Sequence, residues 1–216
     1  MEDYPWRRKP PSEITEPKLL LAEGNDAYWF CRKACGVFGL TGFQVIDFGG
    51  KKELGTKLKT LKEISGFEQN AEVVVVISDA DTLASGESDS VQNALKKAKF
   101  TAPKKPFEVA EGNPRTAFIL FPGLDESGKL IQSGTLEDLC LATIENKTLL
   151  ECVDSYLSCC KKAGSRIRRL HKHKLHAYLS GRDKFVGMDI AEASRANAWN
   201  WNHPRMKPFK DLLTSL

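Results

Sequence analysis

The sequence contains no stretch that approaches the length of about 18 consecutive apolar residues needed by a membrane-spanning helix. The N-terminal segment MEDYPWRRKPP carries charges and prolines, where a secretory signal has an apolar centre. These absences favour a cytoplasmic protein that does not contact a membrane. With 216 residues, 41% of them hydrophobic, the chain can form one domain with an extension.

Several sequence motifs are also missing. None of the six cysteines forms a C-x-x-C pair, so a zinc knuckle is not expected. Cys31 and Cys35 lie four residues apart on a predicted helix, which is possible metal-ligand spacing, but we favour small buried side chains. We find no Ser/His/Asp triad, no Walker loop and no Rossmann glycine fingerprint.

Positive charge is scarce in the first part of the chain and concentrated at the end. Residues 161–216 carry 13 Lys and Arg against 4 Asp and Glu, whereas residues 1–160 carry 19 against 24. Clustered cations gain affinity for phosphates by displacing counterions, so the asymmetry suggests a polyanionic partner. A solvated basic helix face would leave the same pattern, and charge alone does not decide between the two.

The order of apolar segments predicts an α/β fold. Short strand-like runs alternate with helical patterns up to about residue 145, which indicates a mostly parallel four-stranded sheet flanked by helices. The run VVVVI at 73–77 is expected to be a central strand buried on both faces. The predicted strands are 19–22, 43–48, 73–77 and 116–121, and the predicted helices before residue 145 are 26–38, 52–64, 88–99 and one that begins at 135.

The domain organisation follows from these patterns. Residues 1–16 are polar and rich in charge and proline, which predicts a flexible arm. Residues 17–145 form the α/β domain. Residues 146–216 are expected to be a basic α-helical extension packed on it, with helices near 147–162, 165–180, 189–197 and 205–215.

Acidic residues stand where predicted strands end. Glu23 closes the first strand, Asp79 and Asp81 close the third, and Glu137 lies at the helix start after the fourth. Ligands gather beyond the carboxyl ends of parallel strands, and residues i and i+2 of an extended chain face the same way. Neighbouring carboxylates repel each other unless a cation neutralises them, and Mg²⁺ or Mn²⁺ suits oxygen ligands.

Each acid also has an ordinary structural interpretation. An Asp after a buried strand often caps the next helix or a turn, and this applies to Asp79 or Asp81 taken singly. The combination favours a metal site, because Gly24 permits close approach of the backbone directly after Glu23.

Two motifs resemble those of the Toprim domain. The segment LLAEGND at 20–26 is similar to its glutamate motif, and VVVISDAD at 74–81 is similar to its Asp-x-Asp motif. Four further segments resemble a bacterial family of small, uncharacterised Toprim-like proteins: DFGG at 47–50, GTLEDL at 134–139, KLHAYL at 174–179 and WNWNHP at 199–204. The general resemblance covers residues 17–145 and the narrower one runs to the C-terminus.

The resemblance implies phosphodiester chemistry of the nuclease type. By position, Glu23, Asp79 and Asp81 would hold Mg²⁺ or Mn²⁺, with Glu23 also in a catalytic role. Glu137 resembles the additional acid of the nuclease branch, and Asp26 is matched to an acid shortly after the glutamate. Many nuclease members have that acid four residues after the glutamate, where this chain has an alanine, so the second metal site is the weaker part of the match.

The predicted helix 165–180 has one unusual apolar stripe. Ile167, Leu170, Lys174 and Tyr178 follow helical spacing, which places a lysine among apolar residues. A lysine there needs a carboxylate or phosphate partner, and Lys174 is therefore a candidate for stabilising phosphate charge during cleavage. The alternative is a lysine whose stem lies on the core while its ammonium reaches solvent.

A second stripe on the same helix is cationic. Arg166, Arg169, His173 and His176 form a predicted nucleic-acid-binding surface. The histidine spacing does not direct three imidazoles to one face, so we do not interpret them as a metal site. The two tryptophans of WNWNHP could stack on bases, but packing of a C-terminal turn is the favoured interpretation.

The working hypothesis from the sequence is a Mg²⁺- or Mn²⁺-dependent nuclease acting on DNA or RNA. The alternative is a non-catalytic Toprim module that binds nucleic acid or regulates a partner protein. A receiver-like phosphorylation domain also uses acids at strand ends, but Pro122-Gly123 offers no lysine after the later strand, and this hypothesis ranks last.

Overall fold

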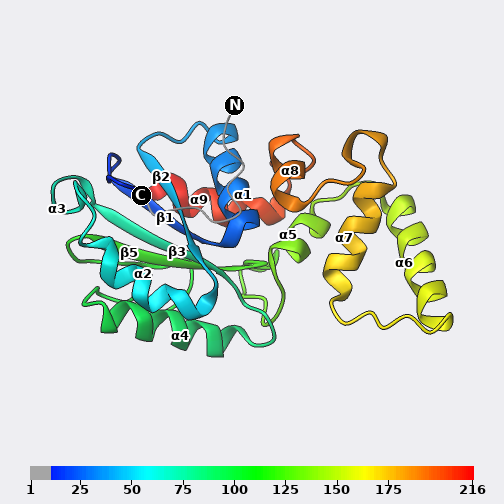
Figure 1. Ribbon diagram of the computed structural model, residues 1–216, viewed down its shortest axis with the longest axis horizontal. Coiled ribbons are helices and arrows are strands. Elements are labelled where there is room, and N and C mark those ends of the chain that lie inside the picture. The colour runs from blue at the N-terminus through cyan, green and yellow to red at the C-terminus, as the bar shows by residue number, and fades with distance from the viewer. Residues whose placement is uncertain (1–10) are drawn as a thin grey trace.

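A five-stranded sheet forms the centre of the computed structural model, which describes residues 11–216 (Figure 1). The strand order is β2-β1-β3-β5-β4, and all neighbouring strands are parallel except β4 and β5. The α/β prediction and its four strands are confirmed, while β4 was missed because it has only 2 residues. The strands are β1 Lys18–Glu23, β2 Phe43–Gly49, β3 Val73–Asp79, β4 Val109–Ala110 and β5 Arg115–Phe121.

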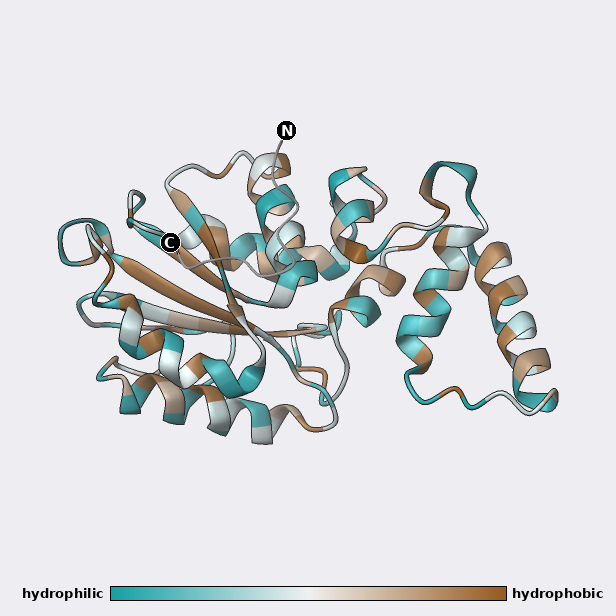
Figure 2. Ribbon diagram, in the orientation of Figure 1, coloured by the Kyte–Doolittle hydropathy of each residue, from teal (hydrophilic) through white to brown (hydrophobic). Residues whose placement is uncertain are grey.

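β3 is the central strand of the sheet and is buried on both faces, as the sequence predicted. Val73, Val75 and Ile77 pack into the core on one face of the sheet, and Val74 and Val76 pack into the core on the other. Alternate side chains of a strand point to opposite faces, so a strand buried on both sides needs a continuous apolar run. Figure 2 shows these strands as hydrophobic ribbons between helices whose outer surfaces are hydrophilic.

Helices cover both faces of the sheet (Figure 1). One face is covered by α2 Leu54–Leu61 and α4 Ala84–Lys97, with the short helices η1 Lys51–Glu53 and α3 Phe67–Asn70 nearby. The other face is covered by α1 Gly24–Val37, α5 Leu136–Ala142 and α9 Lys207–Ser215. Cys31 and Cys35 lie buried in this second layer, which confirms their interpretation as core residues.

The C-terminal residues share the core of the α/β domain. The remaining helices are α6 Lys147–Lys162, α7 Leu170–Ser180, η2 Asp183–Phe185, α8 Ile190–Arg195 and η3 Pro204–Met206. Trp201 lies 5.0 Å from Phe30 of α1 between ring centroids, and Phe209 lies 5.8 Å from Phe121 of β5. Trp199 is also buried, so the packing interpretation of WNWNHP is confirmed.

α6 and α7 form an antiparallel hairpin that extends beyond the carboxyl ends of the strands, with α5 between the hairpin and the sheet (Figure 1). The predicted helix 147–162 matches α6, but α7 begins at Leu170 rather than at residue 165. Ile167 consequently lies outside the helix. α6 has 16 residues, and within residues 11–216 no helix combines the length and the apolar character required to cross a bilayer.

The N-terminal segment differs from the predicted flexible arm. Residues 1–10 lie outside the described residues, but the backbone N–H of Ile14 donates to the carbonyl of Ser65 at 2.8 Å. The Ile14 side chain is fully buried in the layer of α2 and α4. Gln44 of β2 donates to the carbonyl of Glu13 and accepts from the N–H of Thr15. The prediction was wrong for residues 13–15, because one isoleucine among polar residues gave no periodic signal.

This anchoring predicts that Ile14→Ala lowers the free energy of unfolding by about 2–4 kcal/mol, since it removes a fully buried side chain and leaves a cavity. Urea denaturation followed by circular dichroism measures the loss. Val37→Ala, at an exposed position on α1, should change stability by less than about 0.5 kcal/mol. Equal effects of the two substitutions would contradict the anchored segment.

Candidate functional site

Two neighbouring parallel strands deliver the first pair of acids. Glu23 is the last residue of β1 and Asp79 is the last residue of β3, so both lie at the carboxyl edge of the sheet. The Glu23 Oε2 accepts a hydrogen bond from the Ser78 hydroxyl and another from the backbone N–H of Asp79 at 3.4 Å. Burial raises the pKa of Glu23 above its ordinary value, although the Ser78 bond and Lys51 act against the shift.

Asp79 joins the sheet to α5. Its Oδ1 accepts the backbone N–H of Leu136, the first residue of α5, at 2.9 Å. The carboxylate thus binds the first N–H of the next helix, as the structural interpretation of an Asp after a strand predicted. It also lies near the carboxylates of Glu137 and Glu23. Burial, followed by the negative charges of Glu137 and Glu23, raises the pKa of Asp79 to about 8. Asp79 therefore keeps its proton at neutral pH unless a further cation comes close to it.

Asp81 reaches the site by a different route from the one predicted. β3 ends at Asp79, and Asp81 has a φ of +50°, so the two-residue alternation of an extended strand does not apply. Its backbone N–H and carbonyl are bonded to Gly134 at 2.8 and 2.7 Å, which fixes the turn after β3. The exposed Asp81 carboxylate lies 2.7 Å from the Lys51 ammonium. The interpretation of positions 79 and 81 as an extended pair is corrected, and the closeness of Asp81 to the site comes from a turn.

Lys51 is a site residue that the sequence analysis missed. Its ammonium donates to the backbone carbonyl of Asp79 at 3.0 Å and lies 2.7 Å from Asp81 and 2.9 Å from Glu87. Three oxygen acceptors satisfy its three N–H donors. Lys51 follows Gly49 and Gly50 at the carboxyl end of β2, so the only sequence signal was a lysine at a strand end next to β1.

Glu137 forms the second ion pair of the site. It lies in the first turn of α5, is only 3% exposed, and pairs with the Lys172 ammonium from α7. Burial alone would raise the pKa of Glu137, but the hydrogen bond and charge of Lys172 lower it below its ordinary value. The pair links α7 of the hairpin to the acidic edge of the sheet.

Asp26 lies at the border of the same cluster. Its Oδ1 accepts the backbone N–H of Ala191 in α8 at 3.3 Å. Burial and the charge of Asp189 raise its pKa, with a smaller contribution from Glu137 and an opposing one from Lys172. The structure therefore gathers all five predicted acids in one charged region, which we call the acidic cluster: Glu23, Asp26, Asp79, Asp81 and Glu137.

Lys174, the predicted phosphate-stabilising lysine, points elsewhere. Its ammonium lies 2.7 Å from Asp154 of α6, so it joins the two helices of the hairpin. The buried residues of α7 include Leu175 and Leu179, and Lys172 precedes them by three and seven residues on the same side of the helix. The prediction for Lys174 is corrected: the lysine that meets the acidic cluster is Lys172. That spacing to the two leucines was the signal in the sequence.

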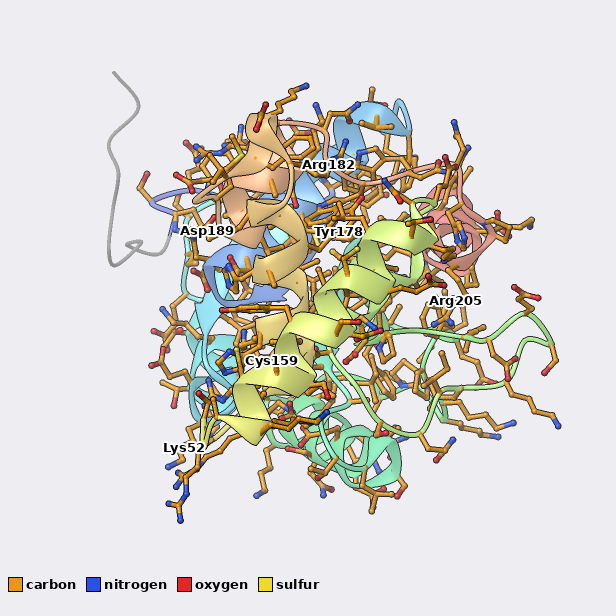
Figure 3. All side chains as sticks on the ribbon, turned by 90° about the vertical axis from the view of Figure 1, so that its right-hand side faces the viewer. Lys52, Cys159, Tyr178, Arg182, Asp189 and Arg205 are labelled. Atoms are coloured by element: carbon orange, nitrogen blue, oxygen red, sulfur yellow. The ribbon has the colours of Figure 1, made fainter. Side chains whose placement is uncertain are left out.

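The four predicted nucleic-acid contacts, Arg166, Arg169, His173 and His176, are all exposed on the hairpin. Arg166, His173 and His176 line a cavity of about 790 Å³ between α6 and α7. Arg169 precedes the first residue of α7 and does not line it. Figure 3 views this side of the molecule, with α6 crossing in front of α7 and Cys159 labelled near the loop end of α6. The structure therefore brings three of the four around one cavity.

The carboxylates match Mg²⁺ or Mn²⁺ in donor chemistry but are not arranged around one point. Within residues 11–216, no three His, Cys, Asp or Glu side chains are grouped so that they could hold one ion. The ammonium of Lys51 forms an ion pair with Asp81, and the ammonium of Lys172 forms one with Glu137. Glu23, Asp26 and Asp79 have no lysine within ion-pairing distance among the described residues, so their carboxylates keep oxygen atoms for a cation.

Comparisons with known proteins give one match. A protein-family model with the description "Protein of unknown function (DUF3226)" matches residues 17–216. No curated protein and no solved structure matched the chain. The match begins next to β1 and includes the sheet, the acidic cluster and the hairpin, so a single family model covers all three.

The raised pKa of Asp79 predicts how stability depends on pH in the metal-free protein. The folded carboxyl keeps its proton up to about pH 8, whereas the unfolded one loses it near its ordinary value of 3.8. The folded state therefore binds more protons between these values, and stability falls as the pH rises through them. Asp79→Asn removes this dependence, so its stability relative to the wild type in EDTA should rise by about 3–4 kcal/mol between pH 5 and pH 8.

Urea unfolding of both proteins at pH 5 and pH 8 measures this change. Other titrating groups are the same in both proteins, so the comparison isolates Asp79. If the stabilities of the two proteins changed alike between pH 5 and pH 8, the pKa of Asp79 would not be raised in the folded state.

The ion pair of Glu137 gives a second stability prediction. Lys172→Met should lower the free energy of unfolding by about 1–2 kcal/mol, because Glu137 stays buried without its partner. The value is reduced from that of a fully buried pair since the Lys172 side chain is 40% exposed. The double variant Lys172→Met/Glu137→Gln should regain most of the loss.

Lys174→Met is the matched control on the same helix. Its partner Asp154 is 54% exposed, so the loss should stay below about 1 kcal/mol. A double-mutant cycle on the Lys172 pair measures the coupling directly. Equal losses at the two lysines would mean that Glu137 does not depend on Lys172.

Proposed function

Because the chain belongs to the DUF3226 family over residues 17–216, whose description assigns no activity, we propose its function from the site: a divalent-metal-dependent nuclease that hydrolyses phosphodiester bonds of DNA or RNA. The cofactor in this proposal is Mg²⁺ or Mn²⁺, and the substrate is a polyanion. We extend the proposal to the fold family, a Toprim-type domain, which the acids after β1 and β3 of a parallel sheet support.

One observation carries the proposal. Glu23 and Asp79, on adjacent strands, lie at one edge of the sheet with raised pKa values, and Glu137 comes beside them through α5. A protein that needed these positions only for folding could use neutral caps, since isolated buried carboxylates destabilise the fold. Buried acids with shifted pKa values cluster at functional sites more often than elsewhere. A divalent cation would neutralise the charge that Lys51 and Lys172 leave over.

We propose the following role for each residue of the site. Glu23 and Asp79 would hold the ion, with Asp81 and Asp26 as further oxygen donors and Glu137 orienting the site. A bound divalent ion supplies Lewis acidity at a phosphate and lowers the pKa of a water molecule. Lys172 takes the role first assigned to Lys174, because its ammonium already faces the cluster and can exchange Glu137 for a phosphate oxygen.

A second candidate function is a non-catalytic nucleic-acid-binding or regulatory subunit of a partner complex. The specific observation in its favour is the pair of lysines: Lys51 saturates Asp81 and Glu87, and Lys172 saturates Glu137. A site neutralised from within has less need of a metal ion. Under this proposal nucleic acid binds the basic hairpin, and this binding persists when the carboxylates are substituted.

Incubation of the purified chain with single- and double-stranded DNA and RNA, in Mg²⁺, Mn²⁺ or EDTA, separates the two proposals. We expect metal-dependent cleavage that Asp79→Asn and Glu23→Gln each reduce at least about 100-fold. These isosteric variants keep the hydrogen bonds, so loss of folding does not explain loss of cleavage. Asp79→Ala/Asp81→Ala should abolish cleavage while leaving binding intact.

Asp89→Ala is the matched control, since it removes an exposed carboxylate on α4 outside the cluster. Binding of Mn²⁺ should also raise the melting temperature of the wild type and not that of Asp79→Asn. Nucleic-acid binding without cleavage in any metal, and without stabilisation by Mn²⁺, would reject the nuclease in favour of the binding module.

A further inference from the structure

The hairpin contains a groove that the acidic cluster does not account for. α6 packs against α7, and α7 packs against α5, so the outer part of the hairpin has no further layer over it. The cavity of about 790 Å³ lies between the two helices and the loop that joins them. We call it the hairpin groove: Cys152, Val153, Tyr156, Leu157, Cys160, Ser165, Arg166, Ile167, Lys172, His173, His176, Ala177, Ser180 and Gly181.

The charges of the groove have one sign. Arg166, Lys172, His173 and His176 line it, and none of its described lining residues is an Asp or Glu. The nearest acidic partner is Glu137, which Lys172 reaches from the groove. Lys174 is held outside by Asp154 and does not line it. A groove lined by basic N–H donors and no carboxylates is complementary to phosphate groups.

The groove also has an exposed aromatic ring. The Tyr156 side chain is 59% exposed although it lies among the apolar residues Val153, Leu157 and Ile167. Nucleic-acid bases stack on exposed aromatic rings, and such stacking requires an unpaired base. The volume of the groove lies in the range of sites for small ligands, which is room for a few nucleotides of a single strand.

Lys172 connects the groove to the acidic cluster. Its side chain lines the groove, and its ammonium bonds to Glu137, which contributes to the raised pKa of Asp79. A strand in the groove therefore ends next to the carboxylates at the edge of the sheet. The order along the path is cations and aromatic ring first, then Lys172, then Glu137 and Asp79.

We infer that the hairpin groove binds single-stranded nucleic acid, with phosphates on Arg166, His173 and His176 and a base against Tyr156, and directs the strand past Lys172 toward the acidic cluster. This inference rests on the proposed function and specifies its substrate as a single strand. It also assigns a role to Tyr156, which neither the charge pattern nor the family comparison identified.

The test is fluorescence anisotropy with labelled oligonucleotides of about 12 nucleotides, single-stranded and as a duplex, in EDTA so that no cleavage occurs. We expect the single strand to bind at least about tenfold more tightly than the duplex. Tyr156→Leu should weaken single-strand binding about tenfold, and Tyr156→Phe should retain it because the ring is kept. Arg166→Ala should weaken binding and reduce the salt dependence by the contribution of about one phosphate contact.

Lys97→Ala is the matched control for Arg166→Ala, because it removes an exposed cation from α4 on the opposite side of the sheet. It should leave binding within about twofold. If Lys97→Ala and Arg166→Ala lowered the affinity for the single strand equally, the effect would come from net charge alone and the groove inference would be wrong. Preference for a duplex, or full affinity of Tyr156→Leu, would also overturn it.

Binding and cleavage are measured separately, so the two proposals can fail independently. If the groove variants bind normally while Asp79→Asn abolishes Mn²⁺-dependent cleavage, the groove inference is wrong and the nuclease stands. If the groove variants lose binding and no metal supports cleavage, the groove stands and the nuclease is wrong. Absence of binding to every oligonucleotide would reject the groove.

Discussion

The structure depends on how it accommodates negative charge at the covered edge of a parallel sheet. Glu23 and Asp79 end adjacent strands and are half-buried, and α5 adds the buried Glu137 to the same place. Carboxylates in such surroundings require donors or cations. The chain supplies three kinds: the Ser78 hydroxyl, backbone N–H groups of Asp79 and Leu136, and the ammonium groups of Lys51 and Lys172.

The same requirement fixes the position of the C-terminal half. Lys172 of α7 pairs with Glu137, and the N–H of Ala191 in α8 reaches Asp26, so two separate C-terminal helices end at the cluster. α9 then returns to the face of the sheet beside α1, where Phe209 packs on Phe30 and Phe121. The region predicted as an extension thus completes both the core and the site. Charge pairing orients the hairpin, while apolar packing holds the layer behind it.

Charge balance also distinguishes the two proposed functions. Two lysines face five acids, and the carboxylates of Glu23, Asp26 and Asp79 depend on hydrogen bonds and not on ion pairs. A divalent cation and a lysine are alternative ways to neutralise such a site, and they compete for the same oxygens. In an enzyme the cation would need to reach these carboxylate oxygens, whereas in a binding module the lysines would remain paired with them. The hairpin groove serves either function, because it binds phosphates through residues outside the cluster.

Local sequence patterns were enough to predict the α/β class, four strands and most helices, because the continuous apolar run of β3 and the helical periodicities are patterns that burial enforces. They also located the acids at strand ends, since parallel strands all end at one edge. Which lysine meets these acids depended on how α7 packs between α5 and α6: Lys172 faces Glu137 of α5, and Lys174 faces Asp154 of α6. The turn at Asp81, the burial of Ile14 and the place of Lys51 likewise depend on distant partners, namely Gly134, Ser65 and Glu87. Contacts between residues far apart in the chain leave no periodic trace in the sequence, and for that reason they had to be found in the fold.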